Sequence, residues 1–143
     1  MSLEIMAYIG IGSSFAFSMM GSVVGALIAG SAVIGAWKKC FIQNKPAPFI
    51  MVAFAGCPLT NIIYGFILMG QLAISDVNSF MLMFMGIAAG IGIGASSYVQ
   101  ARCAACAAEA YAETGQGFGN YIMVIGICET ISLFAMVFTM LAA

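Results

Sequence analysis

Apolar residues run through the chain in four long stretches, which short polar breaks separate. The stretches cover approximately residues 7–37, 49–74, 80–112 and 120–143. A membrane-spanning helix needs about 20 predominantly apolar residues, so each stretch is long enough to cross a bilayer. The strands of a membrane barrel would instead alternate apolar and polar residues, and this chain lacks that pattern. The sequence therefore predicts an all-α integral membrane protein, a single membrane domain with four transmembrane helices.

The composition agrees with a membrane protein and excludes several soluble classes. Of the 143 residues, 64% are hydrophobic and 6% are charged, whereas about 25% of the residues in a soluble domain are charged. So few charges cannot cover the surface of a water-soluble globule, which rules out a soluble enzyme and a disordered tail. The net charge of −1 provides no basic surface for a nucleic acid.

The cysteines indicate packing rather than chemistry. They are Cys40, Cys57, Cys103, Cys106 and Cys128, an odd number scattered through apolar stretches. Such a set is not a disulfide framework. Cys103 and Cys106 form a C-x-x-C pair, but the sequence has no second pair and no histidine to complete a zinc site. We interpret the cysteines as small apolar residues on helices.

The basic residues predict the orientation in the membrane. Lys38, Lys39 and Lys45 lie between the first two stretches, so the positive-inside rule places that connection in the cytoplasm. With four spans, the connection that holds Glu113 is also cytoplasmic, and both termini and Asp76 lie outside. The first apolar stretch has no basic leader and is too long for a signal peptide. The short chain without a leader favours a prokaryotic cell membrane.

The two halves of the chain, residues 1–75 and 76–143, resemble each other weakly. A shift of about 70 residues places Gly56 on Gly126 and superimposes the two pairs of apolar stretches. Repetition of this kind indicates one structural unit used twice. We interpret the chain as two fused helical hairpins.

The first and third stretches are slimmer than the second and fourth. They carry glycines at four-residue spacing, such as Gly21 with Gly25 and Gly86 with Gly90, which let helix backbones approach closely. The second and fourth stretches are rich in bulky phenylalanine, leucine, isoleucine and methionine. A closed ring of many copies, with helices 1 and 3 inside and helices 2 and 4 outside, would use this difference. A plain four-helix bundle is the alternative.

One carboxylate lies deep inside an apolar stretch. Glu129 is nine residues past Asn120, or roughly 13 Å along a helix axis, which is near the middle of a membrane. An ionisable residue at that depth is costly and is by default a candidate functional site. The alternative is a structural glutamate that stays protonated or bonds to a neighbour.

Oxygen-bearing groups lie at a matching depth in the second and third stretches. They are Thr60, Asn61, Tyr64 and Gln100. Pro58 has no N–H and loosens the helix, so a nearby carbonyl can turn toward a ligand. Oxygen ligands suit a hard cation. A proton needs only the carboxylate and one hydrogen-bond partner, so the number of neutral oxygens favours Na⁺. H⁺ stays the alternative, since buried polar groups can also satisfy one another.

Three motifs at this depth resemble one known family, the membrane rotor subunit of V-type ATPases. This subunit is also called the K or c subunit or the proteolipid. The segment CPLTNIIYGF at residues 57–66 resembles the second-helix pattern of Pro, then Thr-Gln, then Tyr-Gly-Phe. Gln100 with Ala101-Arg102 resembles the third-helix motif, and Glu129-Thr130 resembles the ion-carrying Glu-Thr of the fourth helix. The resemblance covers essentially the whole chain and is strongest to the bacterial Na⁺-transporting form.

The resemblance implies a set of ion ligands and one supporting hydrogen bond. The implied ligands are the Cys57 carbonyl, Thr60, Asn61, Gln100 and Glu129. The implied hydrogen bond joins Tyr64 to the carboxylate. Asn61 replaces the glutamine of the family and is one methylene shorter, so water could bridge it to the ion.

The resemblance also implies a function in ion transport. Identical copies would form a membrane ring that carries Na⁺, or alternatively H⁺, on Glu129. The implied partners are a stator subunit with an arginine, a central stalk subunit and the lipid bilayer. ATP would be hydrolysed or made elsewhere, and the chain itself would be non-catalytic and hold no nucleotide, as it has no P-loop motif.

Two rival classes fit less well. A small four-helix ion-coupled transporter, such as a multidrug exporter, carries its glutamate in the first helix, where this chain has only Glu4. A structural or fusion-type proteolipid needs no ion site, and the polar groups gathered at one depth argue against it.

Overall fold

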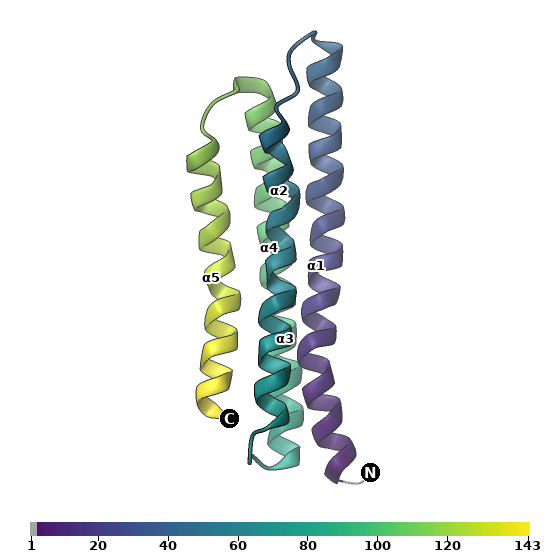
Figure 1. Cartoon of the computed structure of the whole chain (residues 1–143), viewed down its shortest axis with the longest axis vertical. Coiled ribbons are helices and arrows are strands. Elements are labelled where there is room, and N and C mark those ends of the chain that lie inside the picture. The colour runs from purple at the N-terminus through teal and green to yellow at the C-terminus, as the bar shows by residue number, and fades with distance from the viewer. Residues whose placement is uncertain (1–2) are drawn as a thin grey trace.

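The computed structural model describes residues 3–143, and this part of the chain consists of helices joined by short connections, with no strand (Figure 1). The elements are α1 (Leu3–Ile42), η1 (Phe49–Met51), α2 (Val52–Gly56), η2 (Cys57–Leu59), α3 (Thr60–Ala73), α4 (Ser79–Thr114) and α5 (Phe118–Ala142). The pieces from η1 to α3 follow one another as a single rod, here called the second span. With α1, α4 and α5 it makes four helices that are long and apolar enough to cross a membrane. The predicted all-α fold of an integral, multi-pass membrane protein is confirmed.

α1 and α4 extend beyond the apolar stretches that predicted them. α1 runs from Leu3 to Ile42 and α4 from Ser79 to Thr114. Lysine and glutamate are good helix formers, so the polar residues at the ends continue the helices. The apolar pattern marks the membrane-embedded part of a helix and not its full length.

α1 and α4 run in the same direction and form the most closely packed pair. Glycine makes this approach possible, because a Cβ atom on Gly86 would overlap the backbone of Gly10. A Cβ on Gly21 would likewise overlap the backbone of Gly94. The slim helices predicted for an inner position are therefore in direct backbone contact within one chain.

The second span changes its helical form at Pro58. The segment Cys57–Leu59 is a 3-10 turn between α2 and α3. Proline lacks an N–H and clashes with the carbonyl four residues earlier, so it interrupts a regular α-helix. The span stays straight enough to lie along α1 and α4, and it is seen in front of α4 in Figure 1.

Two connections lie at one end of the molecule, where α1 and α4 end and α5 begins (Figure 1). Trp37 lies near the end of α1, and its Nε1 donates a hydrogen bond at 3.0 Å to the carbonyl of Pro48 in the connection that follows. In the connection before α5, Gly115 and Gly117 have φ angles of 66° and 83°. Glycine adopts this left-handed conformation without steric cost, which allows the tight reversal from α4 to α5.

Candidate ion-binding site

The site is built around Glu129, halfway along α5. The other acidic residues of the chain lie near the ends of the helices or in connections. Tyr64 Oη, from α3, donates a hydrogen bond to Glu129 Oε1 at 2.7 Å. Gln100 Nε2, from α4, donates to Glu129 Oε2 at 3.2 Å. Each carboxylate oxygen therefore has one donor, and the donors come from two different helices.

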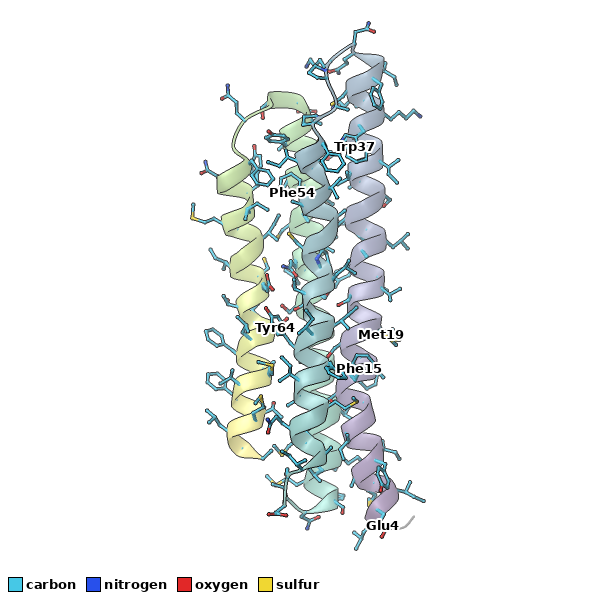
Figure 2. The ribbon with its side chains drawn as sticks, in the orientation of Figure 1. Glu4, Phe15, Met19, Trp37, Phe54 and Tyr64 are labelled. Carbon is cyan, nitrogen blue, oxygen red and sulfur yellow. The ribbon has the colours of Figure 1, made fainter. Side chains whose placement is uncertain are left out.

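The placement of these three residues follows from where the helices meet. Tyr64, labelled in Figure 2, lies on the side of α3 that faces α5. Gln100 is fully buried on α4, and Glu129 is partly buried on α5. The carboxylate thus sits at the edge of the helix packing and not at its centre.

Two further buried residues extend the network away from the carboxylate. Asn61 Nδ2 donates to Gln100 Oε1 at 2.7 Å. Ser132 Oγ in turn donates to Asn61 Oδ1. Asn61, Gln100 and Ser132 are all completely buried. These hydrogen bonds form a continuous line from Ser132 through Asn61 and Gln100 to Glu129.

Residues around Pro58 form the neighbouring part of the site. Thr60 Oγ1 donates to the carbonyl of Cys57 at 2.9 Å, and so does the backbone N–H of Thr60. The carbonyl of Pro58 accepts a hydrogen bond from Ser97 Oγ of α4 at 2.9 Å. The 3-10 turn and the first residue of α3 therefore place carbonyl and hydroxyl oxygens just before Asn61 in the second span.

The structure separates the six predicted site residues into three groups. Glu129, Gln100 and Tyr64 are in direct hydrogen-bond contact. Asn61 bonds to Gln100, one step removed from the carboxylate. Cys57 and Thr60 bond to each other. The sequence analysis separated only Tyr64, as a hydrogen-bond partner of the carboxylate, from the other five residues, which it treated alike as ion ligands.

Ser132 was missed by the sequence analysis. It lies three residues after Glu129 on α5. Residues three apart on a helix share a face, so this spacing is a signal that could have identified it. Ser96 and Ser97 of α4 were also missed. They lie within one turn of Gln100, where a serine on a glycine-rich and alanine-rich helix resembles a packing residue.

The oxygen-bearing groups of the site suit a hard cation. Carboxylate, amide, hydroxyl and backbone carbonyl oxygens are hard ligands, which favour cations of the same character over soft metals. The fold and this site define a class of helical membrane protein that holds one carboxylate at mid-depth, surrounded by polar groups from other helices.

A comparison with protein families found one similarity. Residues 83–142 match the family model that describes the C subunit of ATP synthase. The match covers nearly all of α4 and α5, including Gln100 and Glu129. A comparison with curated proteins found no match. The second half of the chain is therefore similar to the C subunit of ATP synthase.

Proposed function

We propose that this chain is a rotor-ring subunit of a V-type rotary ATPase and that Glu129 carries Na⁺ across the membrane. The proposal rests on one observation above all. A single carboxylate lies within an apolar span, and Tyr64 and Gln100, from two other helices, each donate a hydrogen bond to it. The match of residues 83–142 to the C subunit of ATP synthase supports the same function.

The transport mechanism follows from the free-energy cost of placing a charge in lipid. A bare carboxylate that faces hydrocarbon is expensive, so a copy of the chain enters the lipid only when a cation neutralises Glu129. Identical copies form a ring, and each copy takes its ion from a stator subunit. An arginine of the stator displaces the ion when the copy returns. A central stalk couples the rotation to ATP hydrolysis or synthesis in a separate catalytic part.

The neutral oxygens near Glu129 favour Na⁺ over H⁺. Na⁺ must replace its hydration shell with several oxygens, whereas a proton needs only the carboxylate. Thr60 and the Cys57 carbonyl supply neutral oxygens on the second span. The amides of Asn61 and Gln100 link that span to the carboxylate. Tyr64 and Gln100 both donate to Glu129, an arrangement suited to a carboxylate paired with a cation. H⁺ transport by the same subunit is the second candidate.

The positive-inside rule supports the orientation of this subunit. Three of its four basic residues, Lys38, Lys39 and Lys45, lie at the end of the molecule that also carries the connection from α4 to α5. We place both of these connections in the cytoplasm of a prokaryotic cell. This end is then the side that faces the central stalk.

Carbodiimide labelling tests the function directly, because the reagent reacts with membrane-embedded carboxyl groups. Membranes that contain the assembled complex are labelled at fixed pH with and without Na⁺, and the modified residue is located by mass spectrometry. We expect label on Glu129 and protection by Na⁺. Glu109→Gln, a change near the end of α4, is the matched control and should label like the wild type.

Two other labelling results would change or overturn this proposal. Labelling of Glu129 that Na⁺ leaves unchanged and that varies only with pH would replace Na⁺ by H⁺ as the transported ion. A complete absence of label on Glu129 in the wild type would overturn the proposed function.

A further inference from the structure

The thiols of Cys103 and Cys128 face each other across the interface between α4 and α5. Their Sγ atoms lie 3.6 Å apart. The thiols of Cys40 and Cys57 instead donate to backbone carbonyls. The thiol that meets Cys103 is therefore 25 positions away in the sequence and is not that of Cys106, which shares its C-x-x-C motif.

Cys103 also lines a groove of about 520 Å³ between α4 and α5. Arg102 and Cys106 line the same groove, whose surface is mostly apolar. Within residues 3–143, no acidic side chain forms an ion pair with Arg102. A small ion in the groove can therefore reach one thiol of the facing pair and an unpaired positive charge.

Two facing thiols are suitable ligands for a soft metal ion. Thiolate sulfur favours soft cations such as Cu⁺. A structural zinc site takes four ligands, and the described part of the chain holds no group of three histidine, cysteine, aspartate or glutamate side chains that could bind a metal. The pair instead matches a cation that accepts two sulfur ligands in a line, as Cu⁺ and Ag⁺ do.

The distance between the two sulfurs fits such an ion after a small movement. A metal–thiolate bond is roughly 2.3 Å long, so two of them in line span about 4.6 Å. The sulfurs lie 3.6 Å apart, and they need to separate by about 1 Å to hold the ion. Cys103 borders the groove, so its side chain has room for this rotation.

The charge of the bound form is also compatible with this place. Two thiols and one cation M⁺ give the complex [M(SR)₂]⁻ and two released protons. A single negative charge is costly within an apolar span unless an opposite charge lies nearby. Arg102 directly precedes Cys103 and lies on the wall of the same groove, so it can supply that charge.

We propose that Cys103 and Cys128 form a binding site for one soft monovalent cation of the Cu⁺ class, with Arg102 as the counter-charge. This site differs in chemistry from the oxygen-bearing groups around Glu129, which suit a hard cation, and it does not depend on the proposed function. A bound ion joins α4 to α5 directly beside Glu129, since Cys128 is the preceding residue.

Retention of Ag⁺ tests the site, because Ag⁺ has the charge and the sulfur preference of Cu⁺ and is stable in air. The assembled complex is purified in detergent, loaded with Ag⁺, dialysed against excess glutathione and analysed for silver. Glutathione removes Ag⁺ from single thiols, whereas two thiols that the fold holds together bind it as a chelate. We expect the wild type to retain about one Ag⁺ per chain more than Cys103→Ser or Cys128→Ser, which should bind it about a hundredfold more weakly.

Cys106→Ser is the matched control. It removes a thiol from the same groove, one that meets no other sulfur within residues 3–143, and should retain Ag⁺ like the wild type. Arg102→Gln should weaken retention by about tenfold or more, because the complex then lacks its counter-charge. Arg102→Lys keeps the charge and should retain Ag⁺. Thermal unfolding of each variant without silver shows whether it folds.

Three results would contradict this inference. Retention at the wild-type level in Cys103→Ser or Cys128→Ser would overturn the site, and so would an equal loss of silver in Cys106→Ser. Unchanged retention in Arg102→Gln would overturn the role of Arg102 as the counter-charge.

A second readout rests on the proposed function. Because the bound ion joins α4 to α5 beside Glu129, Ag⁺ should slow ²²Na⁺ uptake into vesicles in the wild type but not in Cys103→Ser. Equal inhibition of both would overturn an effect of this site on transport. If the wild type takes up no Na⁺, the proposed function fails, and silver retention still decides the metal site.

Discussion

α1 with the second span, and α4 with α5, form two helix pairs, here called the first and second hairpins, which supply different chemistry. In the first, the second span is broken into four pieces around Pro58 and carries neutral oxygens from Cys57, Thr60 and Asn61. In the second, α5 is unbroken over 25 residues and carries the carboxylate of Glu129. The comparison shows that one hairpin provides the charge and the other provides part of its neutral surroundings.

The hairpins also differ in how deeply their helices are packed. α4 has buried residues along its whole length, whereas α5 buries only Ile125 and Ser132. Most of α5 is therefore open to lipid or to another copy of the chain. A carboxylate on the more exposed helix can meet an outside partner, while Gln100 on the buried helix stays fixed behind it.

The strongest test of this division is to move the charge from one hairpin to the other. Glu129→Gln should abolish Na⁺ transport, because no other acidic residue lies at this depth. Leu59 occupies the corresponding place in the first hairpin and is half-exposed. Leu59→Glu in the Glu129→Gln background should not restore ²²Na⁺ uptake into vesicles, since Tyr64 and Gln100 converge only on α5. Restored uptake would show that the hairpins are interchangeable.

The next largest effect should come from the contact that joins the two hairpins. Gly86→Ala places a methyl group against the Gly10 backbone and should destabilise the fold by about 1–3 kcal/mol. Gly35→Ala meets nothing within 4 Å and should be neutral or stabilising by up to about 1 kcal/mol, because alanine favours helix. Thermal unfolding in detergent measures both. Equal effects would mean that the close approach of α1 and α4 does not hold the hairpins together.

A smaller effect is expected from the first hairpin's hydrogen bond to the carboxylate. Tyr64→Phe keeps the ring and removes only the hydroxyl that donates to Glu129 Oε1 at 2.7 Å. The loss of one such bond should raise the Na⁺ concentration that half-protects Glu129 from carbodiimide by about five- to tenfold. Tyr98→Phe, on the exposed side of α4, is the control. If Tyr64→Phe had the same half-protecting Na⁺ concentration as the wild type, the site would lie in the second hairpin alone.

The smallest effect should come from the ion pair between the hairpins. Lys39 at the end of α1 pairs with Glu113 at the end of α4, and both side chains are solvent-exposed. Exposed pairs contribute little because water and salt screen them. Lys39→Gln should shift the thermal midpoint no more than Lys38→Gln does. A clear loss for Lys39→Gln alone would show that this surface contact helps to align α1 with α4.

The sequence by itself determined the class of fold and the central residue of the site. Four apolar stretches predict four spans, since hydrophobic length is a local property of the chain. The position of Glu129 within an apolar stretch can likewise be recognised from the sequence alone. A charge in lipid is costly, and this marks the residue before its partners are known. Depth along the helices placed Tyr64 and Gln100 at the level of Glu129, and the family resemblance implied the hydrogen bond from Tyr64. In the structure both residues donate to Glu129.

The tertiary structure alone decided which partner each polar group has. Depth could not show that Asn61 bonds to Gln100 and Ser132 while Thr60 bonds to Cys57. Those choices depend on the directions of side chains across helix interfaces and on which acceptors are already occupied. Hydrogen bonds require a donor and an acceptor at close range and in line, and such geometry arises only when segments distant in the sequence pack together.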